Sequence, residues 1–244
     1  MNKYYYQHNK SVSLFFIARI FGLVLFIIGI STMAYIFSPL IIWQLTLAPA
    51  FADSQVAVPI PKKILLTPMT MKSLLAASVQ NVSGIDYTNA ANWFPGYAFA
   101  KGSTQHAFYF LSIPKLSINN AYVSTVDTNL ASHLVSLFGT AVPPEKGNTV
   151  IFGHSTLPQL YNEKDYKTIF ANIYKLQIGD IFTTTVDNIV YTYKIFSITV
   201  VDPEDTDVLS QQFDDSYVTL ITCTPPGTIW KRLIIKARIM KLEG

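Results

Sequence analysis

The chain begins with one long apolar stretch. Residues 14–37 are nearly all apolar, and Arg19 is the one charged residue among them. At about 1.5 Å per residue, a helix over this stretch reaches across a hydrocarbon core of about 30 Å. The pattern therefore predicts a transmembrane anchor. A cleaved signal peptide is the alternative, since residues 50–52 (Ala-Phe-Ala) resemble a cleavage site. However, the apolar residues continue almost to Leu47, far beyond the roughly 7 to 15 residues of the apolar core of a signal peptide.

Residues 38–105 show no sustained hydrophobic period. Pro, Ala, Ser, Thr and Asn are scattered through them, and we expect a juxtamembrane linker followed by an N-terminal extension. Residues 69–79 form a candidate short helix. Residues 93–97 (Trp-Phe-Pro-Gly-Tyr) predict an aromatic turn, for which local packing is the expected role and covering a groove is the alternative.

Strand patterns recur through the rest of the chain, residues 106–244. Short segments rich in Val, Ile, Thr, Tyr and Phe are separated by Pro, Gly, Asn or Asp. Roughly seven or eight such segments in this length predict an all-β fold, either a sandwich or a closed barrel. The segments are 108–113, 117–126, 148–152, 180–186, 190–201, 217–223 and 232–240.

One helical pattern interrupts the strands between residues 127 and 139. We expect a short helix there, because four apolar residues recur at helical spacing. His133 lies near their shared face, where we expect a packed or partly exposed side chain without a catalytic role. The four apolar residues are Leu130, Leu134, Leu137 and Phe138.

Charge predicts the orientation of the chain. Lys3, Lys10 and Arg19 are the only charged residues before Pro39, and the remainder carries 15 basic and 15 acidic residues. Positively charged flanks stay in the cytoplasm, so we expect residues 1–13 inside the cell and the C-terminal part outside, as a single-pass membrane protein. The outer part is electroneutral, which argues against nucleic-acid binding despite an isoelectric point of 8.8.

Cys223 is the only cysteine and ends an apolar segment. A single thiol forms no internal disulfide, so it is either a nucleophile or an inert buried residue. If segments 217–223 and 232–240 pair antiparallel around a loop at 224–231, Arg232 lies opposite Cys223, with Cβ atoms about 5 Å apart. Arg232 then holds a cation beside the thiol and donates to a developing oxyanion.

His154 is the candidate base. It follows segment 148–152 directly after Gly153, so its ring meets Cys223 if the two strands are neighbours, which the sequence alone leaves open.

An acidic stretch near residue 205 raises the question of calcium. It lacks the Asp-x-Asp-x-Asp-Gly order of a known calcium loop. We expect a solvated turn followed by a helix start, with Asp205 or Thr206 as the cap. We therefore expect no cofactor, and tuning by calcium stays open. The acidic residues are Asp202, Glu204, Asp205 and Asp207.

These residues together resemble the sortase family of membrane-anchored cysteine transpeptidases. Residues 219–223 (Thr-Leu-Ile-Thr-Cys) match the family's Thr-Leu-x-Thr-Cys segment, and Arg232 follows on the next strand. Residues 147–154 (Gly-Asn-Thr-Val-Ile-Phe-Gly-His) resemble its Gly-Asn-x-x-x-x-Gly-His segment, and residues 113–118 resemble its early strand pair. The resemblance covers residues 108–240.

The resemblance implies a closed eight-stranded β-barrel with short helices, which binds a sorting motif similar to Leu-Pro-x-Thr-Gly. In that scheme Cys223 attacks the carbonyl after Thr and forms a thioester. His154 protonates the leaving amine and deprotonates the incoming one, and Arg232 stabilises the oxyanion. The implied partners are the sorting-signal peptide of surface proteins and an amine acceptor, either a cell-wall precursor or a pilin lysine.

Two features depart from the family's pattern. Ser155 follows the histidine where many relatives have arginine, and residues 53–105 have no counterpart that aligns. Pilin-polymerising members often cover their groove with an Asp-Pro-aromatic lid, and no Asp-Pro occurs between Phe51 and Phe108. The sequence therefore favours a housekeeping or anchoring type.

Three alternatives remain at this point. L,D-transpeptidases carry a Ser-x-Gly-Cys-x-Arg cluster that is absent around Cys223, and papain-like cysteine proteases place the Cys before the His. The third alternative is a non-catalytic surface β-domain. Thiol reactivity distinguishes it, since a binding module has no need of a reactive Cys223.

Overall fold

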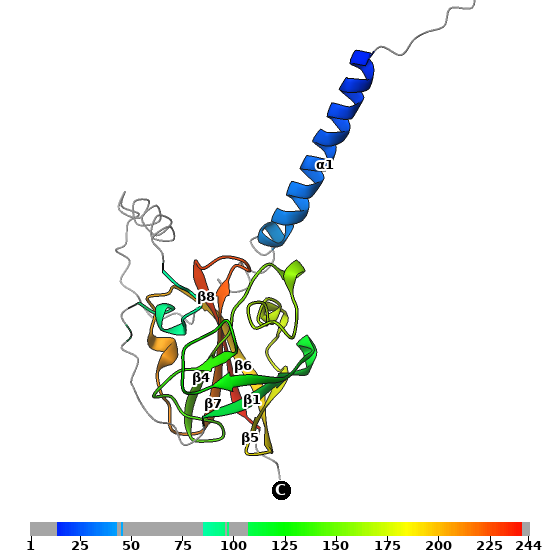
Figure 1. Cartoon of the computed structure of the whole chain (residues 1–244). Helices are drawn as coiled ribbons and strands as arrows, with labels where there is room; N and C mark the ends of the chain where they lie inside the picture. Colours follow the sequence, from blue (N-terminus) through cyan, green and yellow to red (C-terminus); the bar gives the residue numbers. More distant parts are fainter. Residues whose placement is uncertain (1–13, 43–44, 46–84, 96, 98–106, 241–244) are drawn as a thin grey trace, which may run out of the picture. The chain divides into compact units, whose positions relative to one another are not determined.

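The computed structural model describes residues 14–42, 45, 85–95, 97 and 107–240 (Figure 1). The chain divides into two units, Met1–Ile42 and Trp43–Gly244. The helix expected at 69–79 lies outside the described residues and stays a prediction.

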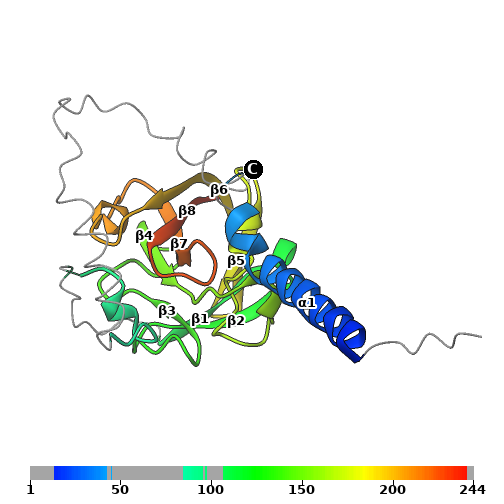
Figure 2. The ribbon, with the colours of Figure 1, turned by 90° about the horizontal axis from the view of Figure 1, so that it is seen from above.

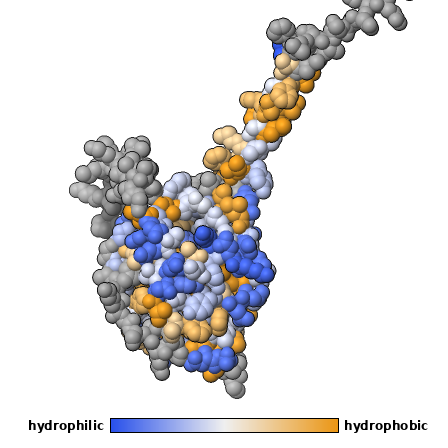
Figure 3. All heavy atoms as spheres, in the orientation of Figure 1, coloured by the Kyte–Doolittle hydropathy of each residue, from blue (hydrophilic) through white to orange (hydrophobic). Residues whose placement is uncertain are grey.

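The first unit contains one helix, α1 (Leu14–Ile42). Within it, Ala18–Ser38 has a mean hydropathy of 2.4 and is long and apolar enough to cross a membrane. Its large apolar side chains are exposed, and Figure 3 shows apolar residues along the face of the helix in view. A helix that is apolar all round requires an apolar environment, so this finding agrees with the predicted anchor, although the helix ends at Ile42 rather than at residue 37.

The second unit contains a closed barrel of eight strands, as expected (Figures 1 and 2). The order around the barrel is β1-β2-β3-β4-β7-β8-β6-β5, in which β2–β3 and β4–β7 are parallel pairs and the others are antiparallel. The strands are β1 (Phe108–Ile113), β2 (Ile118–Ser124), β3 (Leu134–Ser136), β4 (Gly147–Phe152), β5 (Ile181–Val186), β6 (Ile189–Val201), β7 (Ser216–Thr224) and β8 (Lys231–Ile239).

Short 3₁₀ helices connect the strands or precede them. Two of them, η2 and η6, lie on the same side of the barrel (Figures 1 and 2). The 3₁₀ helices are η2 (Ala90–Asn92), η3 (Pro114–Leu116), η4 (Pro158–Leu160), η5 (Ile173–Lys175) and η6 (Asp207–Leu209).

Two buried cores lie on opposite faces of the central strands. Leu220 of β7 belongs to the core inside the barrel, and its neighbour Ile221 belongs to a second core outside it. Successive side chains of a strand point to opposite faces, so β7 is buried on both sides, and all of its residues except Tyr217 are buried. The second core also contains Phe152 of β4, Trp93 and Phe94.

The prediction of a helix between residues 127 and 139 is wrong. The segment forms turns followed by β3, which pairs with both β2 and β4. Leu134 packs inside the barrel, whereas Leu130 and Leu137 pack in the second core. The leucines therefore face two different cores, so their helical spacing does not mark one shared face. β3 has only three residues, which is too short to show the period of two that indicates a strand.

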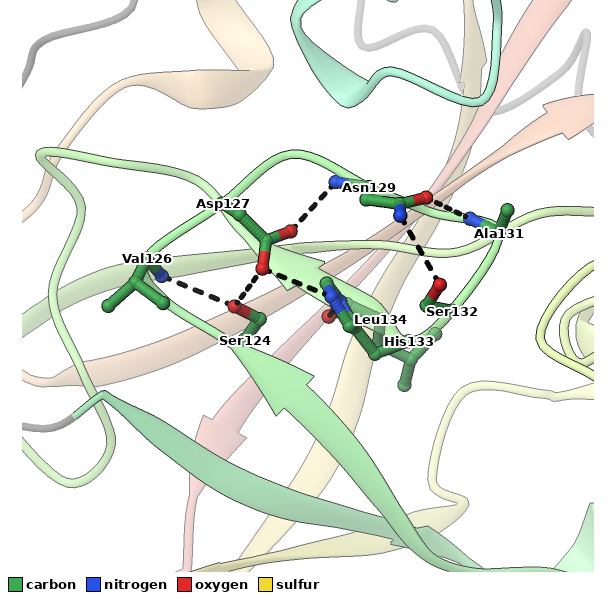
Figure 4. A network of polar contacts seen from close by, with 8 residues as sticks. All are labelled: Ser124, Val126, Asp127, Asn129, Ala131, Ser132, His133 and Leu134. Carbon is green, nitrogen blue, oxygen red and sulfur yellow. Dashed lines mark hydrogen bonds and ion pairs between the residues drawn. The ribbon is translucent and has the colours of Figure 1, made fainter.

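A polar network shapes the loop between β2 and β3 (Figure 4). The Asp127 carboxylate accepts hydrogen bonds from Ser124 Oγ at 3.1 Å and from the Asn129 amide at 2.8 Å, and it pairs with His133 Nε2 at 3.1 Å. His133 Nδ1 donates to the carbonyl of Leu134. His133 is half-buried and holds the loop, which confirms the packed role expected for it.

The acidic stretch forms a turn and a helix start, as expected. The Asp205 amide donates to the carbonyl of Asp202, and η6 follows. Thr206 occupies the N-cap position without a side-chain cap bond, and Asp205 Oδ1 instead accepts from the amide of Asp207 at 3.2 Å. Among the residues that the structure describes, no group of three or more His, Cys, Asp or Glu is arranged to hold a metal ion.

Candidate active site

Cys223 and Arg232 lie directly opposite each other at the end of the β7–β8 pair. β7 continues to Thr224 and β8 begins at Lys231, so the connecting loop is 225–230, slightly shorter than expected. Side chains that oppose each other in an antiparallel pair point to the same face. The predicted register is confirmed, and the guanidinium and thiol share the outer face of the barrel.

His154 follows the strand next to β7. β4 runs parallel to β7, and the pairing ends at Phe152 and Ile221. Two residues further along each strand are His154 and Cys223, so the register carries both to the same edge. The Gly153 amide donates to the carbonyl of Ile221 at 3.1 Å, which continues the pairing to the residue before the histidine. The strand adjacency that the sequence left open is thus present.

Gly153 is required by close packing. A Cβ atom at this position would lie 2.4 Å from the ring of Phe170 and 2.8 Å from the side chain of Leu134. The Phe170 amide also donates to the carbonyl of His154 at 2.9 Å. The glycine therefore lets an aromatic residue from the next loop press against the strand end and hold the backbone of the histidine.

Arg232 is 1% exposed, and backbone carbonyls accept its hydrogen bonds. Nε and Nη2 donate to Trp93 O at 3.2 and 2.8 Å, and Nη1 donates to Ile229 O at 2.9 Å. The guanidinium also lies 5.5 Å from the centre of the Trp93 ring and 6.0 Å from that of Phe94. Carbonyls and rings leave the positive charge unneutralised, so it is suited to stabilising an anion.

The aromatic turn covers this site. We name residues 85–95 the cover segment. The Trp93 ring lies 5.7 Å from the His154 ring and 5.6 Å from the Phe152 ring, and both Trp93 and Phe94 are fully buried. Because Trp93 contacts residues far along the chain, the aromatic turn does more than pack locally. It also covers the site, which was the alternative role considered for it.

Backbone pairing fixes the cover segment to the β2–β3 loop. The Ala90 amide donates to Thr128 O at 2.9 Å, and the Leu130 amide donates to Thr88 O at 2.8 Å. Sequence reasoning missed this pairing and the carbonyl contact between Trp93 and Arg232, since no residue spacing links segments so far apart in the chain.

Burial favours the neutral forms of both candidate residues, Cys223 and His154. Burial raises the pKa of the Cys223 thiol, and the nearby Arg232 charge offsets this only in part. Burial lowers the pKa of His154, with a smaller upward effect of Asp86. His154 Nε2 is buried and has no hydrogen-bond partner among the described residues. The covered site is therefore arranged as a resting thiol and neutral imidazole.

Comparison with known proteins decides the family. A sortase domain model matches residues 111–240, more than half of the chain. The chain belongs to the sortase family. Sortase D of Bacillus subtilis (strain 168) is 27% identical over 175 residues, which cover 69% of this chain and 82% of that protein. The enzyme is thus a cysteine transpeptidase, which sets aside the L,D-transpeptidase, cysteine protease and non-catalytic alternatives.

A solved sortase structure agrees with the barrel. Sortase A from Corynebacterium diphtheriae is 26% identical with a TM-score of 0.51, and the match covers 72% of this chain and 87% of that one. A Sortase D5 transpeptidase from Clostridium perfringens is 32% identical with a TM-score of 0.46, over 55% of this chain and 79% of that one. Relatives of the A and D types both occur among these sortases, so the subclass stays a prediction.

Proposed function

We propose that this sortase cleaves a sorting motif similar to Leu-Pro-x-Thr-Gly and transfers the acyl group to an amine at the cell surface. One observation carries the proposal: Cys223 lies opposite Arg232 in the β7–β8 pair, at the edge to which the parallel strand β4 brings His154. Nucleophile, cation and base thus come from three adjacent strands at one end of the barrel.

The chemistry assigns one role to each side chain. Once the site is open, the Cys223 thiol gives its proton to His154, and the resulting thiolate attacks the carbonyl carbon after Thr. The N–H groups of Arg232 donate to the oxygen that becomes negative. The C–N bond then breaks, His154 gives its proton to the leaving amine, and a thioester remains on Cys223. An incoming amine attacks the thioester and loses a proton to His154, which restores the thiolate and the imidazolium.

The cover segment has to move before this chemistry begins. Trp93 O accepts from two nitrogens of Arg232, which are the donors assigned to the oxyanion, and the Trp93 ring packs on His154. A substrate carbonyl therefore takes the place of the Trp93 carbonyl.

The same proposal includes the cellular arrangement. Residues 1–13 are cytoplasmic, 14–37 anchor the chain, 38–105 link and extend it, and 106–244 form the catalytic domain outside the cell. The positive charges before the apolar helix support this orientation. The partners are the sorting-signal peptide of surface proteins and an amine on a cell-wall precursor or a pilin lysine.

A peptide panel tests the reaction. The full chain in detergent micelles is incubated with peptides of the Leu-Pro-x-Thr-Gly type, and mass spectrometry is expected to detect a thioester on Cys223. Triglycine is expected to divert the product from free acid to amide. Cys223→Ala is expected to abolish both, since no other thiol exists in the chain. Turnover by Cys223→Ala, or products insensitive to triglycine, would contradict the proposal.

A further inference from the structure

Two side-chain hydroxyls extend the β4–β7 pairing beyond its last residue pair. The regular pairing ends at Phe152 and Ile221. Past that point, Thr222 Oγ1 donates to the carbonyl of Gly153 at 2.7 Å, and Ser155 Oγ donates to the carbonyl of Cys223 at 2.7 Å. The two bonds cross between the strands in opposite directions, one on each side of the His154–Cys223 level.

We propose that Ser155 is a positioning residue, which holds the backbone of His154 level with Cys223 through its hydrogen bond to the Cys223 carbonyl. The inference rests on the proposed function, because it assigns His154 and Cys223 to one reaction. Ser155 does not touch the substrate in this assignment, and it acts only through its neighbour in the chain.

The surroundings of His154 explain why a backbone clamp is needed. Its Nε2 has no hydrogen-bond partner in the described part of the chain, so no bond at that atom orients the ring. The ring packs against Trp93, which belongs to the cover segment and leaves when the site opens. What stays on the barrel is the backbone: Phe170 N bonds the His154 carbonyl, and Ser155 Oγ bonds the Cys223 carbonyl.

The bond also links the two reacting residues directly. It ends on the carbonyl of Cys223 itself and starts from the residue that follows His154, so any slip of the β4 end along β7 has to break it. Reaction rates depend steeply on such placement, and a displacement of about 1 Å can cost about a hundredfold. A hydroxyl on a short side chain suits this position, because it replaces a backbone donor where regular pairing has ended.

Three substitutions of the full-length enzyme test the inference. Ser155→Ala removes the hydroxyl. Ser155→Thr and Ser155→Val form a matched pair, because the two side chains have the same shape and only threonine carries a hydroxyl. We expect kcat toward the peptide that the wild type turns over to fall about tenfold in the Ala and Val variants, with KM within about twofold. Ser155→Thr is expected to retain kcat within about threefold of the wild type.

A second measurement needs no peptide. The rate of Cys223 alkylation by iodoacetamide is followed against pH. Its midpoint is expected to move to higher pH in Ser155→Ala and Ser155→Val, since in the opened site a displaced His154 ring accepts the thiol proton less well and stabilises the thiolate less. Ser112→Ala is the control, because Ser112 Oγ accepts from the Asn120 amide in the β1–β2 hairpin. We expect its kcat and alkylation midpoint to equal those of the wild type.

The outcomes separate the inference from the proposed function. If the wild type turns over no peptide, the proposed function fails, and the alkylation midpoint still decides the role of Ser155. Equal kcat and equal midpoints in Ser155→Thr and Ser155→Val would overturn the inference. A loss confined to thermal stability, with kcat and the midpoint unchanged, would show that the bond is merely structural.

Discussion

The backbone carbonyl of Trp93 accepts hydrogen bonds from both Nε and Nη2 of Arg232, at 3.2 and 2.8 Å. A planar guanidinium presents these two N–H groups side by side, so one oxygen between them receives both. The structure thus shows Arg232 binding a carbonyl oxygen with the geometry that the proposed reaction requires of it. The oxygen belongs to Trp93 of the cover segment, so a substrate carbonyl can bind these N–H groups only after the cover segment has moved away.

Removing the Trp93 side chain is expected to open the site. Trp93→Ala deletes the ring contacts with His154 and Arg232. Each reduction of about 1.4 kcal/mol in the free energy that favours the closed cover segment raises the population of the open site about tenfold. We therefore expect Cys223 to react with iodoacetamide at least about tenfold faster at pH 7.5. Ile85→Ala, an exposed position on the same segment, is the control and should react like the wild type. Equal rates in all three proteins would show that the segment does not limit access.

Arg232→Lys tests the paired donors. Lysine keeps the charge but presents a single nitrogen, which cannot reproduce the two parallel bonds. We expect kcat to fall by about 10²- to 10³-fold, as when a donor to an oxyanion is lost.

Arg238→Lys supplies the matched control for that substitution on the same strand. Arg238 pairs with Asp215 at the other end of β8, away from Cys223. Its turnover is expected to stay within about twofold of the wild type. A wild-type kcat in Arg232→Lys would remove Arg232 from the mechanism.

Burial of His154 predicts a specific dependence of stability on pH. The pKa of His154 is lowered in the folded protein, so its neutral form is favoured there, and the associated stability is present above the ordinary value of about 6.5 and lost as the pH falls through the folded pKa. His154→Gln cannot take up this proton. We expect the wild-type Tm minus the variant Tm to decrease from pH 7.5 to pH 5, as measured by thermal denaturation. A constant or increasing difference would contradict the assigned burial effect.

The parts of the site that the sequence predicted are those set by short-range rules. β7 and β8 are joined by one loop, so hairpin geometry alone placed Cys223 opposite Arg232. The position of β4, the strand that ends just before His154, could not be predicted in this way. Its parallel pairing with β7 joins segments about seventy residues apart, and no local pattern determines which strand lies beside which.

The sequence offered covering as one alternative for the aromatic turn, but it could not identify Arg232 as the contact of Trp93, for a physical reason. Its contact with Arg232 spans 139 residues and is made by a backbone carbonyl, which every residue type possesses. Only the aromatic character of the turn was visible in the sequence. β3 was missed because alternation over three residues does not differ from chance.

Gly153 offers a prediction about packing behind the site. In Gly153→Ala the new Cβ meets the Phe170 ring at 2.4 Å, so the ring or the strand end has to shift. Overpacking of this kind costs about 1 to 3 kcal/mol, and we expect urea denaturation to show a loss in that range. The shift also displaces His154, whose carbonyl accepts from the Phe170 amide, so kcat should fall together with stability.

A double-mutant cycle distinguishes this clash from a general effect of the substitution. Phe170→Leu removes the ring edge that the new methyl group meets, so Gly153→Ala is expected to cost less in the Phe170→Leu background than alone, with a coupling of at least about 0.5 kcal/mol. Additive losses would mean that the clash with Phe170 is not the reason for glycine at this position. The glycine before the histidine would then have to be explained by the contact with Leu134, which lies 2.8 Å from the same Cβ position.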